Sequence, residues 1–224
     1  METEQIAGLE CLVSRPPAAV ASLVLLHGYA MDAHDLAPLA EAMRLPVTLC
    51  VPRAPRTVPR GGRCWWPIDE SRRAAQLQLG PRDLWREHPP FRPELRATVC
   101  TLLDCLDQAR GPLPRFLAGF SQGGMLCIDT LLQARPPLAG LGLFSTSCIA
   151  LDEWQPLLPA VRELPTLLCH GTADADLAFA AGERLRDTLR SGGARVTWHP
   201  FDGGHEMPFT VWRQLKRFVA AALT

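Results

Sequence analysis

Short runs of apolar residues alternate with longer amphipathic segments along most of the chain. Most of the short runs are apolar at nearly every position, which is typical of strands buried on both faces of a parallel sheet. The longer segments place apolar residues three and four positions apart, the spacing of an α-helix. The pattern predicts strands over residues 21–26, 47–51, 115–119, 138–144, 166–169 and 194–199. It predicts helices over residues 35–43, 93–108, 122–133, 179–191 and 208–223.

The order of these elements predicts one α/β domain that spans residues 1–224. Strands and helices alternate, which favours a mostly parallel central sheet with helices on both faces. One stretch, residues 52–93, interrupts the alternation, because it is rich in Pro, Arg and Gly and contains Trp65 and Trp66. We expect this stretch to be a long surface excursion, a kind of segment that is often functional in compact enzymes.

Composition and charge exclude several classes of function. Twenty-three basic residues balance 23 acidic ones, so the summed charge gives no reason to expect binding to nucleic acid or anionic lipid. The paired arginines Arg72 and Arg73 are expected to lie on a solvated face. Neither a signal peptide nor an apolar run long enough to span a membrane is found in the sequence. Eight scattered cysteines without a C-x-x-C pair predict a reducing, cytoplasmic location, and no cluster of metal ligands is recognisable.

The segment Gly119-Phe120-Ser121-Gln122-Gly123 matches the pattern G-x-S-x-G. An apolar strand leads into it and a helical pattern follows, which is the setting that a nucleophile elbow requires. Glycines at both flanks allow a turn tight enough to lift the serine oxygen clear of the sheet. Ser121 is therefore the predicted nucleophile. A purely structural strand–helix turn is the alternative interpretation.

A serine hydroxyl needs a neighbouring base, and position discriminates among the six histidines. His205 follows the last predicted strand and precedes the last helix, where a hydrolase with the order Ser, acid, His places its base. His170 and His27 end strands, which favours structural roles. The remaining histidines are expected to lie on the surface or to pack: His34, His88 and His199.

The acid that orients the base is expected in the loop after the preceding strand. Asp174 is the preferred candidate there and Asp176 the reserve, while Asp152 and Asp202 are weaker candidates. A solvated loop aspartate is the alternative interpretation for either of the first two.

Backbone amides are expected to stabilise the oxyanion, because a fixed amide costs no reorganisation as charge builds. One donor is the N–H of Gln122, directly after the nucleophile, and the other is the N–H of Tyr29, in the loop after the first long apolar strand. Four residues are candidates for an apolar acyl pocket, with ordinary packing as the alternative: Trp65, Trp66, Phe144 and Cys148.

Taken together, these segments resemble the phospholipase/carboxylesterase family of α/β-hydrolases, which includes the acyl-protein thioesterases. The resemblance covers nearly the whole chain, and its landmarks lie at residues 26–29, 52–55, 65–69, 119–124, 170–174 and 203–205. It implies a small hydrolase without a separate cap domain that needs no cofactor and acts on carboxylic esters or thioesters. Three positions depart from the family pattern: Ala30 replaces a frequent glycine, and Asp176 and Ala178 replace an apolar residue and a proline.

The predicted reaction is a two-step acyl transfer, in which Ser121 is acylated and water then releases the acid. The expected partner is a small-molecule ester or thioester with a short to medium acyl chain, and the sequence predicts no oligomeric state. The same residues could cleave amides or pass the acyl group to another acceptor. A non-catalytic binding protein of the same fold is the alternative from a different class.

Overall fold

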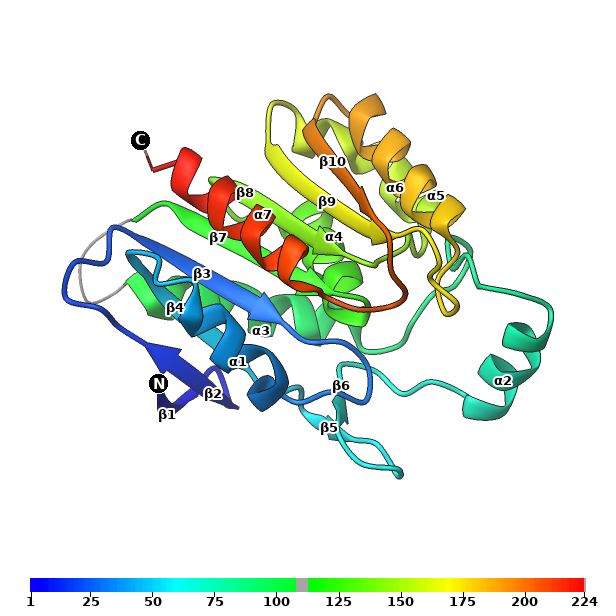
Figure 1. Ribbon diagram of the computed structural model, residues 1–224, viewed down its shortest axis with the longest axis horizontal. Coiled ribbons are helices and arrows are strands. Elements are labelled where there is room, and N and C mark those ends of the chain that lie inside the picture. Colours follow the sequence, from blue (N-terminus) through cyan, green and yellow to red (C-terminus); the bar gives the residue numbers. More distant parts are fainter. Residues whose placement is uncertain (108–112, 224) are drawn as a thin grey trace.

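The computed structural model describes residues 1–107 and 113–223, and its centre is an eight-stranded sheet (Figure 1). The strand order is β1-β2-β4-β3-β7-β8-β9-β10. The pairs from β4 to β10 are parallel, whereas β1–β2 and β2–β4 are antiparallel. The strands are β1 (Glu2–Ile6), β2 (Leu9–Ser14), β3 (Ala21–Leu26), β4 (Val47–Pro52), β7 (Arg115–Phe120), β8 (Gly140–Phe144), β9 (Pro165–Gly171) and β10 (Arg195–Phe201). The prediction of a mostly parallel sheet is confirmed.

Helices cover both faces of the sheet, as predicted. On one face, Leu23 and Leu25 of β3 pack in a core with α1 (Ala33–Ala42) and α7 (Phe209–Ala221). On the other, Val24 and Leu26 pack in a second core with α3 (Arg92–Asp107), α4 (Gln122–Ala134) and α6 (Phe179–Ser191). This alternation follows from the period of two in a strand, which sends successive side chains to opposite faces. A short helix, α5 (Leu151–Trp154), and a 3₁₀ helix, η1 (Gln155–Val161), follow β8.

The predicted bounds of β3 and α6 agree with the structure, and those of the other predicted elements differ by a few residues. The predicted end of the helix over residues 93–108, Gln108, lies outside the described residues. The pattern missed β1 and β2. Strand β1 has the sequence ETEQI and lies at the sheet edge, where polar side chains meet solvent and leave no apolar signal.

Helix α4 is more deeply buried than its pattern indicates. Met125, Ile128 and Leu132 mark one apolar face in the sequence, yet every residue from Gln122 to Leu132 is buried. The helix lies between the sheet and α3, so its outer side is covered as well (Figure 1). A helix in this position is held from all sides, which fixes its N-terminus.

The stretch 52–93 is only partly a surface excursion. It contains the short strands β5 (Arg56–Thr57) and β6 (Arg63–Cys64) and the helix α2 (Glu70–Gln78). Helix α2 has no buried residue and projects from the body of the molecule (Figure 1). Trp65 and Trp66, in contrast, are buried, with exposed fractions of 0% and 4%. Among the described residues, no helix combines the length and apolar character needed to cross a membrane.

Candidate active site

Ser121 sits on the turn between β7 and α4, in a backbone conformation that few residues adopt. Its φ and ψ are 52° and −116°, a region that costs a residue with a side chain on the order of 1–3 kcal/mol. Two hydrogen bonds join the turn to the end of β8 and the segment after it: Ser121 N donates to Phe144 O at 2.8 Å and Thr146 Oγ1 donates to Ser121 O at 2.8 Å. The strain is thus imposed by the neighbouring strand, and the side chain is raised above the sheet.

The two glycines of the motif are required by close contacts between backbones. A Cβ atom at position 119 would lie 2.4 Å from the carbonyl carbon of Gly123. One at position 123 would lie 2.4 Å from the carbonyl oxygen of Leu26. Both contacts are far inside van der Waals range and involve backbone atoms that cannot move aside. The interpretation of the motif as a tight strand–turn–helix elbow is confirmed.

The structure brings Ser121, His205 and Asp174 into one chain of hydrogen bonds. The hydroxyl of Ser121 donates to Nε2 of His205 at 2.9 Å. Nδ1 of the same ring donates to Oδ2 of Asp174 at 2.7 Å. The imidazole therefore faces a hydroxyl on one edge and a carboxylate on the other, an arrangement that can take a proton from the serine and stabilise the resulting cation.

The sheet explains why residues so distant in sequence meet. Strands β9 and β10 are parallel neighbours, so the loops at their carboxyl ends lie side by side. Those loops are joined by backbone hydrogen bonds from Thr172 N to Phe201 O at 2.9 Å and from Ala173 N to Gly203 O at 3.0 Å. Asp174 directly follows Ala173, and His205 lies two residues after Gly203.

Asp174 is set apart from Asp176 by its surroundings. Its exposed fraction is 4%, and Oδ1 accepts the backbone N–H groups of Asp176 and Leu177, both at 2.9 Å. Burial alone would raise the pKa of Asp174, but His170, His205 and the Leu177 amide outweigh it and hold that pKa well below its usual range. Asp174 is consequently ionised at neutral pH, as an acceptor for the His205 ring must be.

His170 is a packed neighbour of this carboxylate. It is fully buried, its Nε2 donates to Leu177 O at 3.0 Å, and the same nitrogen lies 3.4 Å from Asp174 Oδ2. Gly182 makes room for the ring, because a Cβ there would lie 2.5 Å from Nδ1. A structural role, expected from its position at a strand end, fits these contacts.

The two residues predicted to donate to the oxyanion, Tyr29 and Gln122, line the same cavity as Ser121. Gln122 is the first residue of α4, and the first amides of a helix have no partner within it. In the loop after β3, Ala30 N and Met31 N are engaged with Arg63 O and Gly28 O, whereas the Tyr29 amide donates to no other group in the described chain. Ala30 has a φ of 59°, a left-handed conformation that favours glycine, the residue that the resemblance to the family predicts at this position.

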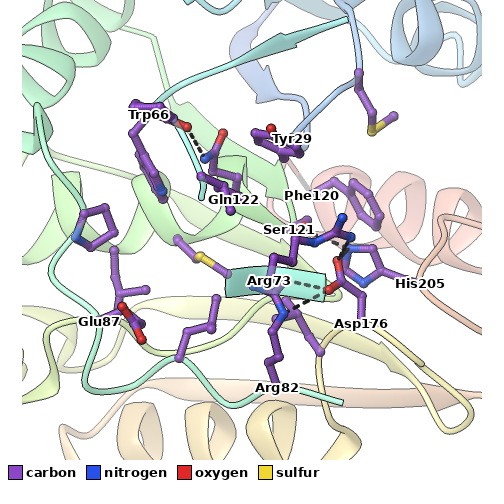
Figure 2. Close-up of a pocket in the computed structure, with 18 of the residues that line it drawn as sticks. Tyr29, Trp66, Arg73, Arg82, Glu87, Phe120, Ser121, Gln122, Asp176 and His205 are labelled. Carbon is purple, nitrogen blue, oxygen red and sulfur yellow. Dashed lines mark hydrogen bonds and ion pairs between the residues drawn. The ribbon is translucent and has the colours of Figure 1, made fainter. Parts of the chain in front are cut away.

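Sequence reasoning missed the role of the Gln122 side chain. Its Nε2 donates to Trp66 O at 2.9 Å (Figure 2), and its Oε1 accepts the Trp65 N–H at 2.9 Å. The indole N–H of Trp65 in turn donates to His27 O at 2.8 Å, at the start of the oxyanion loop. His27 completes the link, since its Nε2 accepts Ala54 N at 3.1 Å. These bonds tie the elbow to the loop that carries Tyr29.

A cavity of about 660 Å³ opens in front of Ser121. Trp66 lines it, but Trp65, Phe144 and Cys148 do not, and all three are fully buried. The prediction that these three residues form an acyl pocket is therefore corrected. The ring of Trp65 lies against that of His27, and Phe144 and Cys148 belong to the two packed cores. Apolar residues close to the elbow thus pack beneath it instead of facing the cavity.

Other residues supply the walls of the cavity. Apolar side chains from five regions of the chain contribute, among them Met31, Leu36, Ile68, Leu84, Phe120, Met125, Ile149, Met207 and Trp212. The ring of Phe120 lies 4.9 Å from that of His205, centroid to centroid. Arg72 and Arg73 both line the cavity, and the expectation of a solvated face fits the exposed Arg72 but not Arg73, whose side chain is 28% exposed. No cluster of potential metal ligands occurs among residues 1–107 and 113–223.

A mostly parallel sheet with a serine on the sharp turn after a central strand, and with an acid and a histidine on the loops after later strands, defines the α/β-hydrolase fold. The family model described as Phospholipase/Carboxylesterase matches residues 97–223, more than half of the chain. The chain therefore belongs to the phospholipase/carboxylesterase family.

Solved structures share the whole architecture. The crystal structure of esterase PE8 is 26% identical, with a TM-score of 0.76 over 95% of this chain and 97% of that one. Acyl-protein thioesterase 2 of Zea mays is 21% identical, with a TM-score of 0.75 over 96% of this chain and 99% of that one, which indicates the same fold.

Curated relatives match over shorter segments. Lysophospholipase-like protein 1 of Mus musculus is 31% identical over 110 residues, which are 48% of this chain and 46% of the relative. Acyl-protein thioesterase 1 of Neurospora crassa is 31% identical over 93 residues, 40% of this chain and 38% of the relative. The matched segments thus span less than half the length of these curated relatives.

Proposed function

We propose that the protein is a serine hydrolase that cleaves carboxylic ester or thioester bonds through an acyl-enzyme intermediate. Ser121 Oγ attacks the carbonyl carbon while its proton passes to His205 Nε2. Asp174 holds the ring and stabilises its cation. The Tyr29 and Gln122 amides receive the oxyanion, and each such donor contributes about 3–4 kcal/mol in comparable sites.

The second half of the reaction reverses these roles. His205 gives its proton to the leaving alcohol or thiol as the bond to the acyl carbon breaks. Water then loses a proton to the same nitrogen and attacks the acyl-enzyme. The proton returns to Ser121 as the carboxylic acid leaves. No step requires a cofactor.

The observation that carries the proposal is the occupation of both ring nitrogens of His205, by Ser121 Oγ at 2.9 Å and by Asp174 Oδ2 at 2.7 Å. Membership of the phospholipase/carboxylesterase family supports it. A cavity of about 660 Å³ supports a small-molecule substrate, since ligand pockets commonly measure ~300–1,000 Å³. We also propose a reducing, cytoplasmic location, which the eight free cysteines support.

The test is covalent labelling combined with hydrolysis of 4-nitrophenyl butyrate. A fluorophosphonate probe is expected to form a single adduct on Ser121, located by peptide mass spectrometry. Ser121→Ala should lose the adduct and lower kcat by roughly 10⁵–10⁶-fold, as loss of the nucleophile does in serine proteases. Ser191→Ala, which changes an exposed serine of α6, is the matched control and should behave as wild type.

Two results would contradict the proposal: labelling of another residue, or ester hydrolysis that survives in Ser121→Ala. Comparison with a 4-nitroanilide of the same acyl group separates esterase from amidase activity. Added alcohol acceptors reveal transfer to an acceptor other than water.

A further inference from the structure

One wall of the cavity carries a cluster of charged residues that the proposed chemistry does not use. Arg73 of α2 and Arg82, which follows that helix, both bind Asp176 of the acid loop (Figure 2). Arg73 Nη2 lies 3.0 Å from Oδ2 of Asp176, and Arg82 Nε lies 3.2 Å from Oδ1. All three residues line the cavity, with side-chain exposures of 28%, 9% and 17%.

The cluster is built into the fold. Backbone hydrogen bonds run from Arg82 N to Asp176 O at 2.9 Å and from Ala178 N to Arg82 O at 2.8 Å, which fixes Arg82 beside the acid loop. Burial alone would raise the pKa of Asp176, but the two guanidinium groups outweigh it and lower that pKa. Asp176 therefore stays ionised and holds both arginines at the cavity wall.

The cluster of Arg73, Arg82 and Asp176 carries one excess positive charge, because two guanidinium groups share one partly buried carboxylate. Arg72 and four further acids also line the cavity, and these acids have other partners: Asp35 and Asp69 cap helices α1 and α2, Glu87 pairs with Arg72, and Glu206 accepts the Gly204 amide. Glu70 lies 3.6 Å from Arg73 Nη1. Its side chain is 45% exposed and also accepts the Tyr29 hydroxyl, so water screens its attraction for Arg73.

The cluster is also close to the reacting atoms. Oδ2 of Asp176 lies 3.8 Å from Nε2 of His205, the nitrogen that the Ser121 hydroxyl contacts at 2.9 Å. A group attached within a few bonds of the attacked carbonyl would reach this wall. Since α2 has no buried residue, Arg73 can turn from Asp176 to a ligand without unpacking a core.

We propose that Arg73, Arg82 and Asp176 form an anion subsite, and that the preferred substrate is an ester or thioester carrying a carboxylate within a few bonds of the scissile carbonyl. This inference rests on the proposed function. Guanidinium groups bind carboxylates through paired N–H donors, which suits this geometry. One excess positive charge matches a monoanion, whereas a phosphate dianion would be repelled by Asp176.

The experiment compares substrates that differ only in charge. One pair varies the acyl side, mono-4-nitrophenyl adipate against its methyl ester. The other varies the leaving group, 3-carboxy-4-nitrophenyl butyrate against its 3-carbamoyl analogue. In at least one pair the anionic member is expected to show a kcat/KM at least about tenfold higher, and 0.5 M NaCl should reduce that preference because salt screens charge attraction.

Variants locate the effect. Arg73→Gln should abolish the preference and Arg73→Lys should keep part of it, because lysine retains the charge without the planar fork. Arg195→Gln is the control, since it removes the same charge at an exposed residue of β10 that pairs with Glu163 and does not line the cavity, and the preference should persist.

Equal rates for both members of each pair, or an unchanged preference in Arg73→Gln, would overturn the anion subsite. These outcomes leave the proposed function intact as long as the neutral esters are cleaved and Ser121 is labelled. If Ser121 is not labelled and no ester is cleaved, the proposed function fails instead.

Discussion

At the scale of single residues, the site depends on which edge of the His205 ring each carboxylate meets. Asp174 contacts Nδ1 at 2.7 Å, whereas Asp176 lies 3.8 Å from Nε2, on the side of the serine. The two aspartates are separated by one residue, and composition alone cannot distinguish them. The distinction arises because Asp174 Oδ1 accepts the amides of the turn that follows, which aims Oδ2 at the ring.

Asp174→Asn is expected to lower kcat for 4-nitrophenyl butyrate by about 10³–10⁴-fold, because an amide at this position favours the wrong tautomer of the histidine. Asp176→Asn is the matched comparison, and its fold-decrease in kcat for this neutral ester should be at least about a hundredfold smaller. Steady-state kinetics of both variants provide the measurement. A larger loss in Asp176→Asn would reassign the acid.

At the scale of elements, the oxyanion loop and the elbow are held together by the segment that follows β6. Trp65 is the link, since its backbone N–H reaches Gln122 and its indole N–H reaches His27 O. A buried tryptophan with its N–H paired is a rigid support. The position of the Tyr29 amide therefore depends on a residue that does not line the cavity.

Trp65→Phe keeps an aromatic ring but removes the hydrogen bond to His27 O. We expect kcat to fall by about ten- to a hundredfold with little change in KM, less than the 10²–10³-fold typical of losing an oxyanion donor outright. Trp198→Phe, on the edge strand β10, is the control. The affinity of a boronic acid transition-state analogue should fall in parallel with kcat. If the melting temperature of Trp65→Phe falls but kcat and the affinity for the boronic acid do not fall together, Trp65 has only a packing role.

At the scale of the whole molecule, one ion cluster joins the antiparallel edge of the sheet to the elements near the site. Arg53, after β4, binds Asp32 at 2.8 Å through Nη2 and Glu10 of β2 at 2.8 Å through Nη1. Asp32 also caps α1. Burial alone would raise the pKa of Asp32, but hydrogen bonds from Arg53 and His34 outweigh it and lower that pKa well below its usual range.

A lowered pKa in the folded state means that Asp32 stabilises the protein above the unfolded pKa of about 3.9 and loses this contribution as the pH falls further. Asp32→Asn keeps a capping side chain but weakens the pairing with Arg53, so it should lower the free energy of unfolding at pH 7 by about 1–3 kcal/mol. The difference in the free energy of unfolding between Asp32→Asn and wild type should become smaller between pH 4 and pH 3. Urea denaturation at pH 7, 5, 4 and 3 measures it, with the exposed Asp202→Asn as control. A constant difference would exclude the ion pair as its cause.

The sequence by itself determined the parallel core and the elbow. Runs such as those of β3 and β7 are apolar at nearly every position, which is typical of strands buried on both faces, so the layers followed from the local pattern. The glycines around Ser121 predicted the tight turn, because the steric requirements of such a turn depend on residues that are adjacent in sequence. Strand β1 escaped detection because an edge strand needs no apolar residues.

Only the tertiary structure decided what lies around the nucleophile. The Trp65–Gln122 and Arg73–Asp176 contacts join residues 57 and 103 positions apart, and no local spacing encodes such pairs. Trp65, Phe144 and Cys148 have the composition of a pocket wall, yet they support the elbow from within the cores. Side-chain type thus predicted which residues are buried, whereas the approach of distant loops determined which of them face the cavity.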